Sequence, residues 1–127
     1  MTLLEAIHRV DALKPNAYSQ SDKVSWLSTL DGMVKRQIID THNLNEDEEE
    51  PSFDGYGDDT DLSTELLIPA PYDEECYVAW LESKIDYSNG EYVKYNNSVL
   101  KFRDFYADFQ NDYNRHHMPK GTKINYF

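Results

Sequence analysis

The clearest pattern in the chain lies between residues 92 and 113, which read YVKYNNSVLKFRDFYADFQNDY. Apolar side chains recur there at alternating steps of three and four residues, which is the period of an α-helix. They are Tyr92, Tyr95, Val99, Phe102, Tyr106, Phe109 and Tyr113. The pattern predicts a helix over 90–116, in which these side chains form one stripe about 21 residues and roughly 32 Å long.

The aromatic character of this stripe indicates more than one role. Apolar residues at helical spacing usually form a core, and bulky rings suit a helical bundle or a wide interface better than a two-helix seam. The chain has ten tyrosines, many for a core of this size, and tyrosine favours interfaces where one edge stays wet. We therefore expect core on one side of the helix and a subunit interface on the other. The predicted interface residues are Tyr92, Tyr95, Phe102, Tyr106, Phe109 and Tyr113.

A shorter helix is predicted immediately upstream, over 71–88. Asn89 and Gly90 end it, and Ser88 and Glu91 have the spacing of a capping box that would start the next helix at once. So short a connection predicts that the two helices fold back as an antiparallel hairpin.

The residues before this hairpin are apolar and then rich in proline. Residues 66–68 are predicted to be extended, since Pro69 and Pro71 follow them. Pro71 suits the first turn of a helix, and the acidic residues 73–75 suit its positive dipole end.

Two further helices are predicted nearer the N-terminus. Thr2 and Glu5 have capping-box spacing at the start of a helix over 2–14, which Pro15 ends. A second helix over 20–41 follows from an apolar stripe formed by Val24, Leu27, Leu30, Val34 and Ile38. The predicted fold is therefore all-α: a single domain over 1–127, a small bundle of about four helices with a long acidic loop and an extended C-terminal tail.

The acidic loop is predicted over 43–64, where helical periodicity is lost. Like charges, glycines and Pro51 disfavour a packed element there. The net charge is −12, yet residues 37–83 hold 15 acidic side chains and no lysine or arginine. Binding to nucleic acid needs Lys and Arg against the phosphates, which argues against a DNA-binding surface in this segment. The densest run is Glu46, Asp47, Glu48, Glu49 and Glu50.

The C-terminal tail, 118–127, combines basic and apolar residues. Chain ends fray by default, but a basic segment with an aromatic tip can also dock on a partner, by adding to a sheet edge or filling a groove. The predicted partner-binding residues of the tail are Lys120, Lys123, Ile124, Tyr126 and Phe127.

The sequence offers little for catalysis or metal binding. Cys76 is the single cysteine, which excludes an internal disulfide, and its acidic neighbours disfavour a thiolate. His116 and His117 are adjacent and point about 100° apart on a helix, which does not suit a shared metal. We expect no enzyme activity, no metal and no cofactor. No apolar stretch approaches the roughly 20 residues of a membrane helix, so a cytoplasmically made, soluble protein is expected.

Several blocks of the chain resemble small proteins of tailed phages and prophages of Gram-positive bacteria. They are LEAIHRVDALKPN at 4–16, LIPAPYDEE at 67–75, IDYSNGEYVKYNNS at 85–98 and YNRHHMPKGTKINYF at 113–127. The acidic loop matches least well. Members typically lie among the virion morphogenesis genes near the capsid gene.

The resemblance implies a structural protein of the virion at the head–tail junction. Such a connector or adaptor forms a ring, commonly of twelve copies, beneath the portal and contacts tail or neck proteins. Double-stranded DNA would pass through without specific binding, and residues 46–50 would either face that channel or receive a basic surface of the portal or tail. The alternative from the charge is a small acidic phage protein that inhibits a host defence enzyme by mimicking DNA, and a mimic needs no ring.

Overall fold

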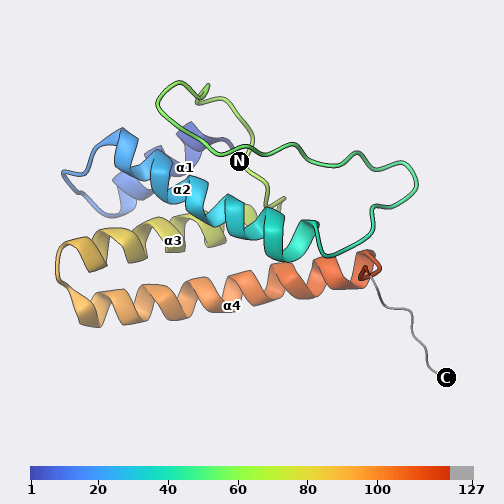
Figure 1. Ribbon diagram of the computed structural model, residues 1–127. Coiled ribbons are helices and arrows are strands. Elements are labelled where there is room, and N and C mark those ends of the chain that lie inside the picture. The colour runs from blue at the N-terminus through green and yellow to red at the C-terminus, as the bar shows by residue number, and fades with distance from the viewer. Residues whose placement is uncertain (121–127) are drawn as a thin grey trace.

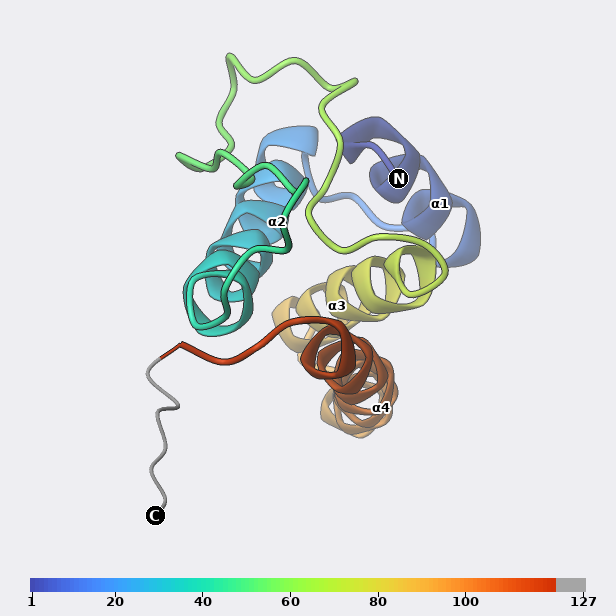
Figure 2. The ribbon, with the colours of Figure 1, turned by 90° about the vertical axis from the view of Figure 1, so that its right-hand side faces the viewer.

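Helix α3, Asp73–Ser88, lies at the centre of the fold and packs against the three other α-helices. The structure is a computed structural model and describes residues 1–120. Viewed from the end, α1 and α2 lie on two sides of α3 and α4 lies below it (Figure 2). The predicted mainly helical fold is confirmed.

The central position of α3 explains which of its residues are buried. Tyr77, Leu81 and Ile85, at helical spacing, are fully buried on a face that the sequence pattern did not single out. Cys76 and Ala79 are also buried. A helix with neighbours on three sides has no single apolar stripe, so its pattern is weak.

Helix α4, Tyr92–His116, folds back along α3 as the predicted antiparallel hairpin (Figure 1). Gly90 has φ +75° at the turn, a conformation that suits glycine. The predicted capping box of Ser88 and Glu91 is wrong, because no side chain caps α4. Glu91 instead donates its backbone N–H to the carbonyl of Asp86 at 2.9 Å, which continues the turn out of α3.

The N-terminal helices begin close to the predicted positions. Thr2 and Glu5 form the capping box of α1, Leu3–Leu13, with bonds of 3.1 and 2.8 Å. Helix α2, Gln20–Val34, continues into a π-helical turn, η1, Lys35–Ile39. The apolar stripe predicted for residues 20–41 is buried along this pair of elements.

The start of α3 differs from the sequence expectation. The helix begins at Asp73 and not at Pro71, which lies in the preceding turn after a cis peptide bond. Tyr72 donates its N–H to the carbonyl of Pro69 at 3.0 Å in that turn. Asp73, with Glu74 and Glu75, then occupies the first helical turn, as predicted from the helix dipole.

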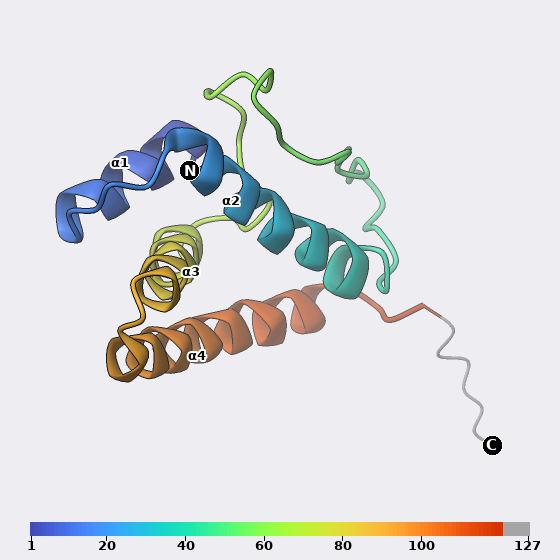
Figure 3. The same ribbon diagram turned by 60° about the vertical axis from the view of Figure 1, so that its left-hand side comes forward.

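Residues 43–72 form neither helix nor strand beyond an isolated bridge, and the middle of this segment arches over the side of α2 away from α4 (Figures 1 and 3). The later half of this segment is held by the body of the protein. Leu3 and Leu4 donate backbone N–H groups to the carbonyls of Thr64 and Leu62 at 3.1 and 3.0 Å. The aromatic ring of Phe53 covers Gly32 of α2, with a ring carbon 3.7 Å from where a Cβ would stand.

A buried carboxylate fastens this segment to two helices. Asp31 of α2 is fully buried and accepts hydrogen bonds of 2.5 Å from the hydroxyls of Tyr56 and Tyr77. The backbone N–H of Leu67 donates to the same carboxylate at 3.0 Å. Tyr77 also accepts from the N–H of Ile68 at 2.7 Å, so one cluster joins α2, α3 and the arching segment.

Among residues 1–120, no helix is both long and apolar enough to span a membrane.

Candidate protein-interaction site

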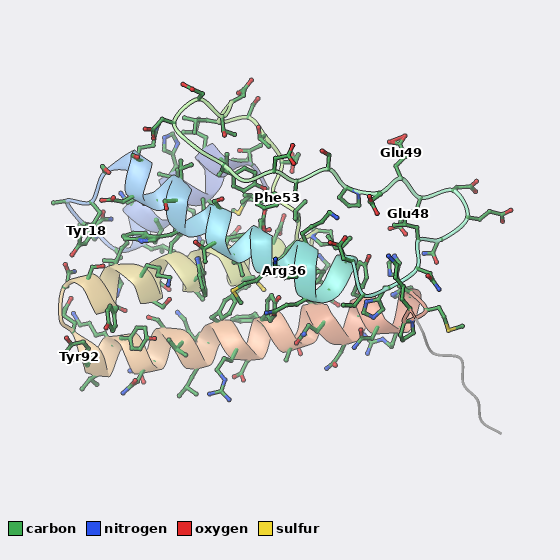
Figure 4. The ribbon with its side chains drawn as sticks, in the orientation of Figure 1. Tyr18, Arg36, Glu48, Glu49, Phe53 and Tyr92 are labelled. Atoms are coloured by element: carbon green, nitrogen blue, oxygen red, sulfur yellow. The ribbon has the colours of Figure 1, made fainter. Side chains whose placement is uncertain are left out.

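The acidic run, Glu46–Glu50, is exposed at the end of the molecule where α4 finishes (Figure 1). Its neighbouring side chains point in different directions. Glu49 extends away from the body, whereas Glu48 points toward the end of α4 (Figure 4). The run therefore presents an acidic surface to solvent, except that Glu48 points toward the end of α4 (Figure 4).

Glu48 ties the acidic run to α4. The ring Nε2 of His117 lies 2.9 and 3.1 Å from the two carboxylate oxygens of Glu48. Asn45 donates its backbone N–H to the same carboxylate at 3.0 Å. This backbone bond, and after it the contact with His117, lower the pKa of Glu48. An ionised Glu48 is thus held between its own loop and the helix end.

The end of α4 is in turn built from stacked rings. His117 lies against Tyr113 with a centroid distance of 3.8 Å and nearly parallel planes. The ring of His42 meets Tyr113 edge-on at 5.1 Å, and its Nδ1 lies 2.6 Å from the carbonyl of Ile38. Since His42 is buried, the helix end is packed against the end of η1 and not free.

Backbone bonds bring the beginning of the tail beside the beginning of the acidic loop. Asn43 donates its N–H to the carbonyl of Met118 at 2.7 Å, and Lys120 donates to Thr41 at 2.8 Å. The two short segments run antiparallel around an isolated bridge between His42 and Pro119. The starts of the acidic loop and of the tail therefore lie side by side.

A groove of about 450 Å³ lies between these elements. Its apolar lining consists of Ile39, Pro51, Leu67, Pro69, Phe109 and Tyr113. Glu48, Asp112, His116 and His117 complete the lining with polar side chains. Phe109 is only 2% exposed and is fixed by its neighbours, so the groove has a preformed apolar floor and a partly acidic rim.

The six predicted interface residues of α4 divide into three groups. Phe102, Tyr106 and Phe109 are buried in the core and contribute to the packing with α3. Tyr92 is 60% exposed, and Tyr95 is partly exposed, at the hairpin turn, where both rings contact Tyr87. Tyr113, partly buried, lines the groove at the opposite end of the helix.

Of the predicted partner-binding residues of the tail, one lies within the described residues. Lys120 is exposed and placed next to Thr41 by the bond above. Lys123, Ile124, Tyr126 and Phe127 lie outside the described residues.

The structure adds three residues that were not predicted from the sequence: Asp31, His42 and Ile39. For Asp31, the sequence did contain a signal, because it is a polar residue within an apolar stripe.

Cys76 is a free, buried cysteine of α3. Burial raises the pKa of Cys76 to about 12, and nearby Asp108 adds to the effect. Within residues 1–120, no cluster of three or more His, Cys, Asp or Glu side chains could hold a metal ion.

No family model matches the chain, and comparison with curated proteins and with solved structures finds no significant match either.

The contact between Glu48 and His117 gives a testable prediction. Replacing Glu48 with Gln removes the ionised partner of His117, so backbone amides of residues 43–50 should exchange with deuterium several-fold faster. Glu49→Gln makes the same charge change on a side chain that points away and should leave exchange unchanged. Equal exchange in the two variants would show that Glu48 does not hold the loop.

Proposed function

We propose that this chain is a structural subunit of a tailed-phage virion at the head–tail junction, where copies form a ring that docks on the portal. The observation that carries the proposal is the position of the two unlike segments. The exposed acidic run, Glu46–Glu50, and the start of the basic, aromatic tail emerge together at the end of α4. The resemblance of four sequence blocks to phage morphogenesis proteins supports the setting.

Ring formation requires each subunit to carry two different, complementary surfaces. A head-to-tail contact closes a ring when its rotation closes, whereas a self-complementary patch gives a dimer. The acidic surface and the basic tail are unlike and opposite in charge, as such a contact needs. A helical body packed around α3 supplies the rigid frame that fixes the angle between copies.

At a head–tail junction, the acidic run could face either the portal or the DNA in the channel. Glu46, Asp47, Glu49 and Glu50 are exposed, and no Lys or Arg occurs between residues 37 and 83 to neutralise them. Against a basic patch of the portal, this charge would accelerate docking and fix its orientation. Facing the channel, it would repel the DNA backbone and let the duplex slide. The proposed role is docking on the portal.

The test is binding to the portal of the same phage in two salt concentrations. The proposal predicts a stoichiometric complex with the portal that persists at physiological salt, because ring contacts add up across copies. Neutralising residues 46–50 as Gln and Asn should weaken docking by at least about tenfold, or roughly 1.4 kcal/mol. Unchanged docking of this variant would contradict a role of the acidic run in binding the portal.

A DNA mimic would give a different result in the same experiment. It would ignore the portal, remain a monomer or dimer, and bind a basic host nuclease with an affinity that falls steeply with salt. That outcome would overturn the structural role.

A further inference from the structure

We propose that the groove at the end of α4 receives the C-terminal tail of a second copy of this chain. This inference rests on the proposed function in one respect only, that copies lie side by side. It adds the identity of the contact that joins them, a basic and aromatic segment seated in an acidic-rimmed apolar groove.

The groove has the size and lining of a peptide-binding pocket. Its volume of about 450 Å³ lies within the range of roughly 300–1,000 Å³ typical of ligand sites. Phe109 forms an immobile floor, because its ring contacts those of Tyr72, Tyr106 and Tyr113. Aromatic anchors that enter such preformed apolar pockets commonly carry most of the energy of an interface.

The rim of the groove carries the charge that would recognise a basic peptide. Glu48 is ionised at neutral pH and stands at one side, next to the exposed remainder of the acidic run. Asp112 is a second acidic residue of the lining, where Arg115 approaches it at 3.7 Å and His116 at 3.6 Å. A lysine ammonium entering between Glu48 and Asp112 would meet two carboxylates.

The tail offers the matching chemistry in a suitable order. Its sequence from residue 120 is KGTKINYF, with Lys120 and Lys123 ahead of Ile124, Tyr126 and Phe127. Residues 121–127 can span at most about 24 Å at roughly 3.4 Å per residue. Lys123, three residues ahead of Tyr126, would therefore lie near the acidic rim when an aromatic side chain at the tip enters the groove.

The direction of the chain favours the groove of a neighbour over that of the same molecule. Residues 118–120 run antiparallel to residues 41–43, so at Lys120 the chain is heading past Thr41. Glu48 and Pro51 of the groove follow Asn43, in the opposite direction. This direction at Lys120 points away from Glu48 of the same chain, and we assign the groove of a second copy to the tail.

Site-directed cross-linking between two full-length variants tests this contact. Both carry Cys76→Ala; one also carries His116→Cys in the groove and the other Phe127→Cys at the tip of the tail. Mixing them with a short bis-maleimide should give a dimer that contains one chain of each kind. Asn96→Cys, exposed near the opposite end of α4, replaces His116→Cys in the control and should give several-fold less product.

Reversing the charge of Lys123 tests whether the acidic rim recognises the tail or the two merely lie close together. Lys123→Glu in the Phe127→Cys chain should lower the cross-link yield several-fold, because Glu48 and Asp112 would repel it. Arg103→Glu, on an exposed turn of α4, is the matched reversal and should leave the yield unchanged. Equal yields in the two reversals would overturn recognition of the tail by the acidic rim.

The remaining outcomes distinguish this inference from the proposed function. One chain carrying both His116→Cys and Phe127→Cys that cross-links only within itself would overturn the assignment to a second copy. Rings that form without the mixed dimer would overturn the tail contact and leave the ring in place. A mixed dimer without rings or portal binding would support the contact and contradict the virion role.

Discussion

Replacing Asp31 with alanine is expected to lower the free energy of unfolding by about 3–5 kcal/mol. The change leaves the hydroxyls of Tyr56 and Tyr77 and the N–H of Leu67 without their acceptor. Each buried donor left unpaired costs about 1–3 kcal/mol, with Tyr77 the most enclosed of the three. The effect should be large because one carboxylate joins two helices and the arching segment.

Urea denaturation followed by circular dichroism measures this loss. Asp58→Ala is the control, since Asp58 is exposed and its bond to Ser21 joins the same arching segment to α2. The control should change the free energy of unfolding by less than about 0.5 kcal/mol. A cost below about 1 kcal/mol for Asp31→Ala would mean that the cluster is not a main support of the fold.

The same residue predicts a pH dependence of stability. Burial raises the pKa of Asp31, although the bonds from Tyr56 and Tyr77 act in the opposite direction. The folded state therefore holds this proton to a higher pH than the unfolded state, whose aspartate titrates near about 3.9. The contribution of Asp31 is greatest below that value and falls as pH rises through the raised pKa. The stability of the wild type relative to Asp31→Asn should accordingly decrease with rising pH.

Replacing Phe109 with alanine is the second substitution expected to have a large effect, about 3–5 kcal/mol. Phe109 is 2% exposed and its ring packs between Tyr106 and Tyr113 of the same helix and Tyr72 ahead of α3. Truncation would leave a cavity between α4 and the residues before α3, and would remove the floor of the groove.

Tyr92→Ala is the informative control for this change. Tyr92 belongs to the same helical stripe in the sequence but is 60% exposed, so its loss should cost less than about 1 kcal/mol. Thermal and urea unfolding of both variants give the comparison. Similar costs at the two positions would mean that the burial along α4 is not as described.

These two positions illustrate what periodicity predicts and what it does not. The pattern from Tyr92 to Tyr113 predicts a helix and one stripe, and α4 has both. It does not show which other segments cover each end of the helix, so exposed Tyr92 and buried Phe109 look alike in the sequence. The capping box of Thr2 and Glu5 was predicted correctly, because it bonds locally and needs no tertiary information, whereas that of Ser88 and Glu91 was not.

The candidate site was harder to predict than the fold. The sequence indicated an acidic run and a basic tail, but their meeting at the end of α4 depends on contacts between residues about 70 positions apart, such as Glu48 with His117. Asp31 lies within an apolar stripe, and its partners Tyr56 and Tyr77 come from two other segments. Only the packing of α3 against α2 and the arching segment brings them together.

The central claim, that the chain works by assembling with copies of itself on a portal, is tested most directly by light scattering. The mass of the purified full-length chain is measured alone and after mixing with the phage portal that the proposed function assigns to it. The account predicts a closed multiple of the 14.9 kDa subunit, alone or on the portal, with a fixed stoichiometry. A monomer whose mass does not change when the portal is added would contradict it.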